Sequence, residues 1–347
     1  MQFSEIIPFS IGILFLFMIN STWARFFGGT ESINILFGFM ATIIVSLFTI
    51  FDLLSKNIEY LKTFIKSSFL ISTLVTWIFL IPILEDSRRE VLFGITSLGN
   101  NDLPLYAQLS MHNLNYGFRG EGQISPISGT IEAGEYLSNY TYIGTIAVID
   151  FLSAFFSFNV IQATSLTLMI SVGFLFMSLR HLGNILNLNS TLSNLLASIG
   201  ILLPVSLYSI SMGFIGALFG IASFAVMISG SLSFAKKQIS EQEFILIMTL
   251  GLSIGIYTYA QISIPILVAL SFIHKINNIL EEKKGRKYQL VKCYGMAGFL
   301  GTLLSFSAIP NLITLTKVLS GEGFGWKLQF FDPIDVFFVD SKYFKSK

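Results

Sequence analysis

Long apolar runs recur along this sequence and constrain its fold more than any other feature. They are roughly 15 to 23 residues long, the length that a helix needs to cross a hydrocarbon core of about 30 Å. Charged residues make up only 12% of the 347 residues, whereas ordinary soluble domains carry about 25%. The alternating segments of about ten residues that are typical of membrane β-barrels are missing. The sequence therefore predicts an all-α, polytopic transmembrane helix bundle.

Nine crossings are predicted along the chain. Three lie in residues 1–84, and six more lie in residues 159–314. The first span follows Glu5 and no Lys or Arg. A secretory signal peptide begins with positive charge, so we expect this span to be retained. The predicted spans are residues 6–20, 33–54, 67–84, 160–178, 188–208, 212–234, 244–257, 263–273 and 290–313.

Basic residues indicate on which side of the membrane each loop lies, because loops rich in Lys and Arg stay in the cytoplasm. With the N-terminus inside, residues 85–158 form a large first extracytoplasmic loop. Residues 315–347 form an extracytoplasmic tail, which we expect to belong to a longer chain. The basic residues that this arrangement places in or beside cytoplasmic loops are Lys56, Lys62, Lys66, Arg180, Lys236, Lys237, Lys275, Lys283, Lys284, Arg286, Lys287 and Lys292.

Residues 143–156 are apolar but short for a span, at about 14 residues against the usual 20. If this segment crossed the membrane, the later basic loops would fall on the wrong side. We therefore expect an interfacial, juxtamembrane or re-entrant helix. Asp150 lies near its middle, and an ionisable group at membrane depth usually faces a cavity or a partner. A plain interfacial carboxylate is the alternative.

A polar stretch at residues 98–120, LGNNDLPLYAQLSMHNLNYGFRG, is where chemistry should be sought. It opens with a turn signal and continues into an amphipathic helix that starts near Asp102. Asp102, Tyr106 and Gln108 lie near the N-terminal end of this helix, and His112 lies further along. Asp102 has two compatible interpretations: a catalytic carboxylate, or a helix cap ahead of a first-turn proline.

The same stretch resembles a known family pattern. Asp102, Tyr106, Ala107, Leu114 and Gly117 match the pattern D-x-x-x-Y-A-x-x-x-x-x-x-L-x-x-G. This is similar to the start of the first extracytoplasmic loop in many GT-C glycosyltransferases, multispanning enzymes that use polyprenyl-phosphate sugars. The order of elements is similar too: a span, an acidic outer loop, a juxtamembrane helix and then a series of spans.

The resemblance implies a function as well as a fold. It implies a GT-C-like enzyme that transfers a sugar from a lipid-linked donor to an extracytoplasmic acceptor, surrounded by membrane lipids. In that family the leading aspartate is the catalytic carboxylate or binds the acceptor or a metal, and the match carries this role onto Asp102 as catalytic base. Many members have a second acid where this chain has Leu103, and their loop follows the first span. No cofactor is therefore certain, and a divalent metal ion stays an open alternative.

Further residues are predicted to bind the substrate. A phosphate leaving group needs cations, and Arg88, Arg89 and Arg119 lie in the predicted external loop, with Lys317 in the tail. The alternative for each is a lipid-headgroup anchor. His112 is a candidate for acid–base work or metal binding, whereas a lone histidine is more commonly a plain polar contact.

Tyr257, Tyr259 and Gln261 occupy a predicted turn between the short spans at residues 244–257 and 263–273. They are candidates for lining a sugar or acceptor groove, because tyrosine offers an apolar face together with a hydroxyl. The alternative is the interfacial belt of tyrosines. The glycines that suit close helix packing are Gly216, Gly220, Gly295, Gly298 and Gly301.

Composition argues against several other functions. The formal net charge of +1 argues against a nucleic-acid-binding protein. Cys293 is the single cysteine, which excludes an intrachain disulfide and a cysteine-based metal cluster. The main rival is a multi-pass transporter or lipid flippase without covalent chemistry, which commonly has repeated halves and midplane charges. A third interpretation is a membrane assembly subunit, and the oligomeric state is open.

Overall fold

The computed structural model describes residues 6–54, 102–118, 143–203, 214–280 and 286–310, with short pieces at 123–124, 131–132, 137, 206, 209–210 and 313. This part of the chain is helical, as predicted, apart from one antiparallel β-pair. The helices are α1 (Ile6–Phe26), α2 (Glu31–Leu54), α5 (Asp102–Tyr116), α7 (Ile143–Phe156), α8 (Val160–Ile185), α9 (Ser190–Leu202), α11 (Ile215–Ala235), α12 (Glu241–Leu280), α13 (Arg286–Leu304) and the 3-10 helix η2 (Phe306–Ala308). The β-pair joins β1 (Gln123–Ile124) to β2 (Ile131–Glu132).

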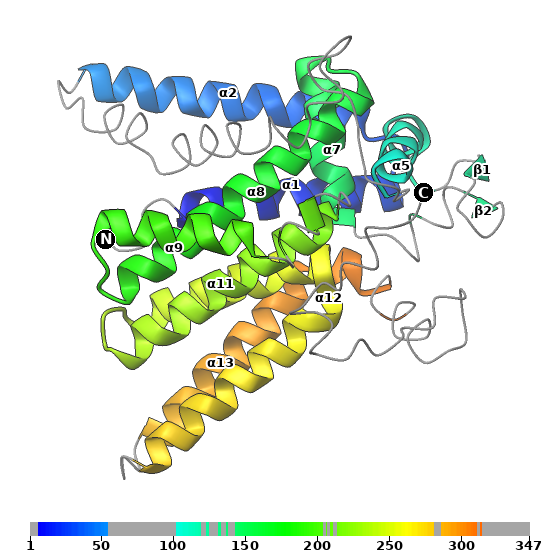
Figure 1. Cartoon of the computed structure of the whole chain (residues 1–347). Helices are drawn as coiled ribbons and strands as arrows, with labels where there is room; N and C mark the ends of the chain where they lie inside the picture. The colour runs from blue at the N-terminus through cyan, green and yellow to red at the C-terminus, as the bar shows by residue number, and fades with distance from the viewer. Residues whose placement is uncertain are drawn as a thin grey trace, which may run out of the picture.

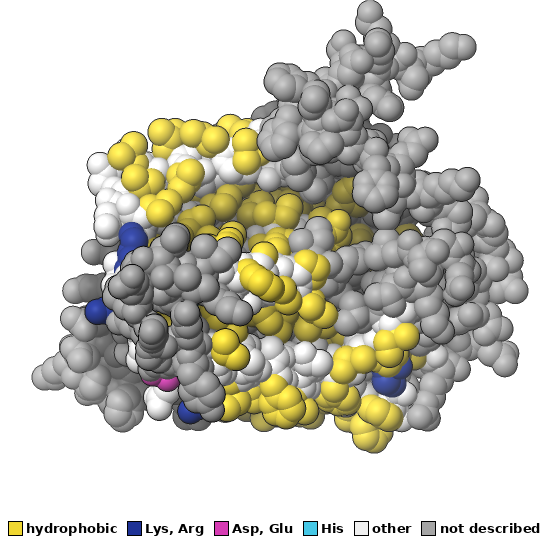
Figure 2. Space-filling view, turned by 90° about the horizontal axis from the view of Figure 1, so that it is seen from below, with side chains coloured by type: hydrophobic (Ala, Val, Ile, Leu, Met, Phe, Trp, Pro, Cys, Tyr) yellow, Lys and Arg dark blue, Asp and Glu magenta, His cyan; other side chains and the backbone are white. Residues whose placement is uncertain are grey.

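Three of these helices, α1, α8 and α11, are long and apolar enough to cross a membrane. Figure 2 shows hydrophobic side chains over most of the described part of one face, with the few charged ones toward its left and right margins. An apolar band between charged margins is what a bilayer requires. The chain is therefore an integral membrane protein, with three candidate spans among its described helices. The predicted crossing at residues 67–84 lies outside the described residues, and the total of nine stays a prediction.

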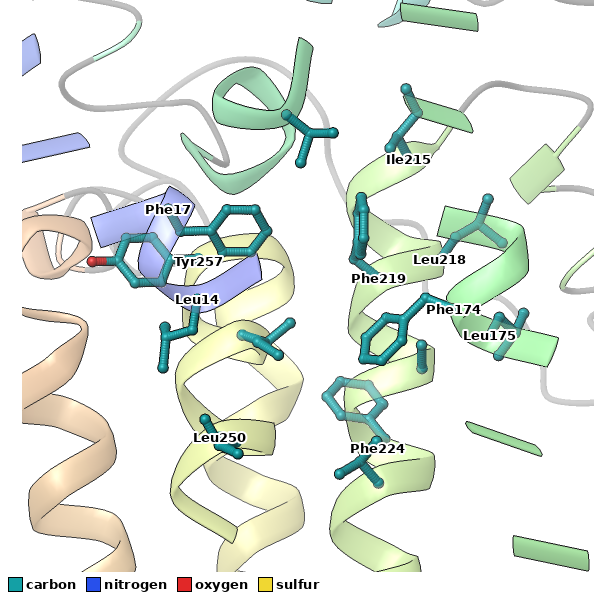
Figure 3. Packing of buried hydrophobic residues seen from close by; sticks show 14 of the residues in the cluster. Leu14, Phe17, Phe174, Leu175, Ile215, Leu218, Phe219, Phe224, Leu250 and Tyr257 are labelled. Atoms are coloured by element: carbon teal, nitrogen blue, oxygen red, sulfur yellow. The ribbon is translucent and has the colours of Figure 1, made fainter. Parts of the chain in front are cut away.

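α8, α11, α12 and α13 pack in chain order, and α9 lies beside α8. α8 lies against α9 and α11, α11 lies against α12, and α12 lies against α13 (Figure 1). α1 joins them through aromatic side chains in the core (Figure 3), where the ring of Phe17 is 6.1 Å from that of Phe219 and 5.6 Å from that of Tyr257. Close packing of this kind is a main force between helices in a membrane. It fixes α1 against α11 and α12.

The turn predicted near residues 257–261 is confirmed. α12 comprises two helices that meet at Tyr259, whose φ of −156° and ψ of 64° are not helical. A Cβ added at Gly255 would come within 2.3 Å of the Ser263 Oγ, although eight residues of straight helix would span about 12 Å. Phe244 and His274, far apart along the chain, both contact the ring of Tyr294. The two halves of α12 are therefore antiparallel.

The predicted close packing at glycines holds at some positions and not at others. A Cβ at Gly220 would lie 2.5 Å from the Tyr259 Cβ, so the turn of α12 rests directly on α11. A Cβ at Gly301 would lie 2.7 Å from Leu252. The prediction is wrong for Gly295, where a Cβ would meet nothing within 4 Å, because this position faces away from the neighbouring helices.

The short apolar segment forms α7 with the predicted bounds, Ile143–Phe156. Every residue from Ile143 to Asp150 is buried, because α1, α2, α5, α8 and α12 pack around the helix. A helix lying on the membrane surface would keep one side open. The first half of α7 therefore lies within the protein.

Candidate functional site

One end of the helix bundle gathers the elements that the sequence singles out. Figure 1 shows α5 beside α7 at this end, and α5 contacts both α7 and α8. A Cβ added at Gly144 would lie 2.9 Å from the Phe17 ring and 3.0 Å from Thr258. The start of α7 therefore meets α1 and the turn of α12. The helix predicted in the external loop, α5, therefore packs against the helix bundle.

Asp150 on α7 is the centre of a buried polar cluster that joins four segments. Its side chain is fully buried. The Ser110 hydroxyl donates to Oδ1 at 2.5 Å, and the Asn113 amide donates to Oδ2 at 2.6 Å. The Thr30 hydroxyl and the Asn20 amide also donate to Oδ2, at 2.9 and 3.3 Å. α1, the residue before α2, and α5 thus all bind one carboxylate on α7.

Among the described residues, the side chains that donate to this carboxylate are all neutral. Burying a charge is costly unless hydrogen bonds replace the lost water. Burial raises the pKa of Asp150, and the hydrogen bonds from Ser110, Asn113, Thr30 and Asn20 act in the opposite direction. The cluster attaches α5 to α7, because two of its four donors, Ser110 and Asn113, lie on α5.

A second attachment holds the C-terminal end of α5 through backbone atoms. The Thr30 N–H donates to the Asn113 carbonyl at 3.0 Å, and the Phe118 N–H donates to the Ala24 carbonyl at 3.1 Å. Gly117 has a φ of +65°, which favours glycine, and a Cβ there would lie 2.4 Å from the Gly28 carbonyl oxygen. The end of α5 is therefore tied to the turn between α1 and α2.

Asp102 is the first residue of α5, so the helix starts within one residue of the predicted position. Its side chain lies outside the described part. With 3.6 residues per turn, position 102 falls on the side of α5 that also carries Tyr106 and Asn113, both of which are buried. The backbone thus places Asp102 one turn before a buried tyrosine, and its role as catalytic base stays a prediction.

Apart from the two tyrosines at the turn of α12, the other residues predicted to bind the substrate divide into those on α5 and those outside the described part of the chain. Tyr106 and His112 are both buried on α5, and the ring of His112 is 5.3 Å from that of Tyr116. Both are therefore part of the packing that holds α5. Those that lie outside the described residues are Arg88, Arg89, Arg119, Lys317 and the side chain of Gln261.

Tyr257 lies inside the core, not on an open surface. Its hydroxyl donates to the Leu304 carbonyl at 3.2 Å and is 2.8 Å from the Ser307 Oγ. Ser307 in turn is 2.7 Å from the Ser21 Oγ. Tyr257 thus joins α12 to α1 and to the segment after α13. Tyr259 is only partly buried and rests on Gly220.

Sequence reasoning missed one cation at this end. Arg25, in the last turn of α1, donates from Nη2 to the Ser307 carbonyl at 3.1 Å. Its guanidinium carbon lies 5.1 Å from the centre of the Phe118 ring, a cation–π contact. A basic residue that ends an apolar span was the available signal. Arg25 places positive charge beside the end of α5.

Comparison with protein-family models, with curated proteins and with solved structures gives no match to this chain. Among the residues that the structure describes, no three His, Cys, Asp or Glu side chains lie together as a metal site would require.

Proposed function

We propose that the chain is a polytopic membrane glycosyltransferase of GT-C type, which transfers a sugar from a polyprenyl-phosphate carrier to an extracytoplasmic acceptor. One observation carries this proposal. α5, which begins at Asp102, is attached through Asp150 and through backbone bonds to one end of a bundle of apolar helices. A carboxylate at such a place meets both a lipid-borne donor and a water-borne acceptor.

The chemistry follows from a carboxylate in this position. The Asp102 carboxylate takes the proton of an acceptor hydroxyl, and that oxygen forms a bond to the anomeric carbon of the sugar. The bond from this carbon to the phosphate oxygen breaks, and polyprenyl phosphate leaves with the electron pair. Arg88, Arg89 and Arg119 bind the phosphate, since arginine suits it. Arg25 adds a further cation at this end of the bundle.

The proposed orientation places the α5 end outside the cell. Basic residues support it, because Arg180, Lys236 and Lys237 lie near the ends of α8 and α11 that are remote from α5. Lys236 joins these ends by donating from Nζ to the Ile185 carbonyl at 2.7 Å.

The test uses the full chain in lipid nanodiscs with three probes: undecaprenyl phosphates that carry glucose, mannose or arabinose. A membrane extract supplies acceptors, and mass spectrometry measures the undecaprenyl phosphate that is released. We expect one donor to be consumed and Asp102→Asn to lower its turnover by at least about 100-fold. Asp52→Asn, the same change on α2, is the control and should leave turnover unchanged. Unchanged turnover in Asp102→Asn, or no consumption of any donor, contradicts the proposal.

The second candidate function is a transporter or lipid flippase. Asp150 favours it, because ionisable groups buried among apolar helices often serve ion or substrate pathways. Proteoliposomes with a fluorescent polyprenyl phosphate distinguish the two functions. Movement of the probe between leaflets that Asp150→Asn abolishes, without release of polyprenyl phosphate from any sugar donor, would favour transport.

A further inference from the structure

Asp150 is the one acidic side chain that is buried within the part of the chain that the structure describes. Two of its four hydrogen-bond donors, Ser110 and Asn113, come from α5. They are three residues apart and so share one face of the helix. Ser110 holds Oδ1 and Asn113 holds Oδ2, so both carboxylate oxygens are bound to α5.

This arrangement fixes the position of α5 along its own axis and its rotation about that axis. A slip of one residue would move the helix by about 1.5 Å and turn it by about 100°. Either change would carry Ser110 and Asn113 away from the carboxylate together. The backbone bonds at Asn113 and Phe118 hold only the C-terminal end of α5. Asp150 therefore adds a polar restraint against pivoting about that end to the packing of Tyr106 and Leu109 in the core.

We infer that Asp150 is a positioning residue, whose carboxylate sets where α5 presents Asp102. The inference rests on the proposed function. Asp102 lies eight residues before Ser110, about 12 Å along the helix axis, so a small tilt at Asp150 becomes a larger displacement at Asp102. A misplacement of about 1 Å at a reacting group can lower a rate by roughly 100-fold.

The key variant is Asp150→Asn. A second substitution, at its partner Asn113, tests whether the lost interaction can be restored. The new amide replaces one carboxylate oxygen by an N–H donor, which faces either Ser110 or the amides of Asn113 and Asn20, so these native donors have to turn to accept. Adding Asn113→Asp restores an amide–carboxylate pair with the two roles exchanged. Asn115→Asp is the matched control, because Asn115 is exposed on the same helix, and within the described part of the chain its side-chain amide donates to the Met111 carbonyl one turn earlier.

Two measurements are needed, both on the full chain in nanodiscs. Hydrogen–deuterium exchange reports how firmly α5 is held, and turnover of the consumed undecaprenyl-phosphate sugar reports catalysis. For Asp150→Asn we expect faster exchange in α5 with unchanged exchange in α11, and a roughly 100-fold lower kcat with KM within about threefold. Adding Asn113→Asp to the Asp150→Asn protein should raise its kcat by at least about tenfold, whereas adding Asn115→Asp should not raise it.

Each other outcome overturns part of the inference. Native exchange in α5 of Asp150→Asn would mean that Asp150 does not hold the helix. Faster exchange with native kcat would mean that it does not position Asp102. If Asp150→Asn fails to fold, Ser110→Ala removes a single donor, and it must then show the same two effects at smaller size. If the native chain consumes no donor, the proposed function fails, while the exchange measurement still decides whether Asp150 fixes α5.

Discussion

The Asn113 amide and the Asp150 carboxylate are joined by a hydrogen bond of 2.6 Å, although 37 positions separate them in the sequence. Removing the carboxylate takes this acceptor away from four side-chain donors, of which Asn113 and Thr30 keep a second acceptor in the Asn20 amide oxygen and the Asn113 carbonyl. We expect Asp150→Ala to lower the free energy of unfolding by about 3 kcal/mol. Denaturant unfolding in detergent measures it, and Asp52→Ala on α2 is the control. An unfolding midpoint equal to that of the native protein would show that the cluster contributes nothing.

Stability should fall with rising pH because of Asp150. Burial raises the pKa of this carboxyl above its ordinary value of 3.8. In the pH range just above that value, the folded state keeps a proton that the unfolded state releases, so folding is favoured at low pH and less so as the pH rises. The Tm should therefore decrease from acid to neutral pH. Asp150→Asn should flatten this decrease, and an identical slope in both proteins would argue against it.

Two glycines provide a matched pair of packing tests. Gly220→Ala would place a Cβ 2.5 Å from that of Tyr259, and neither atom can move without its backbone. We expect a loss of about 1 to 3 kcal/mol in stability. Gly295→Ala meets nothing within 4 Å, and it should be neutral or stabilise α13 by up to about 1 kcal/mol. Thermal unfolding in detergent compares them, and equal effects would contradict the contact between α11 and the turn of α12.

The orientation can be measured with single cysteines in a Cys293→Ser background. Tyr116 is exposed at the end of α5, and Lys237 is exposed after α11. We expect a membrane-impermeant maleimide to label Tyr116→Cys in intact cells and to label Lys237→Cys only after the cells are opened. Labelling of Lys237→Cys in intact cells would reverse the proposed orientation.

Local patterns in the sequence were enough to predict several elements of the structure. The apolar run that forms α7 has the same bounds in the structure, because polar or turn-forming residues end it on both sides. The reversal at Tyr259 was visible as two apolar runs, each too short for a span, around a polar gap. Both signals lie within a few residues of the feature that they predict.

Contacts between distant segments could not be predicted in this way. Nothing near Asn20 or Thr30 indicates that both would bind Asp150, because each lies more than a hundred residues away from it. The spacing of glycines showed that helices can approach closely, but not which side of α13 faces a neighbour. Tyr257 was expected at a surface and is buried, because the turn of α12 lies against α1 and Ser307.

Main-chain atoms make the join between the end of α5 and the turn after α1. Its geometry therefore depends mainly on the glycines that let the two backbones meet, which are Gly28, Gly29 and Gly117. Gln108, Met111 and Asn115 on the exposed face of α5 can be exchanged without disturbing this join. The attachment of α5 and its exposed face can therefore vary independently. A new binding surface could be built on this face without changing how the helix is attached.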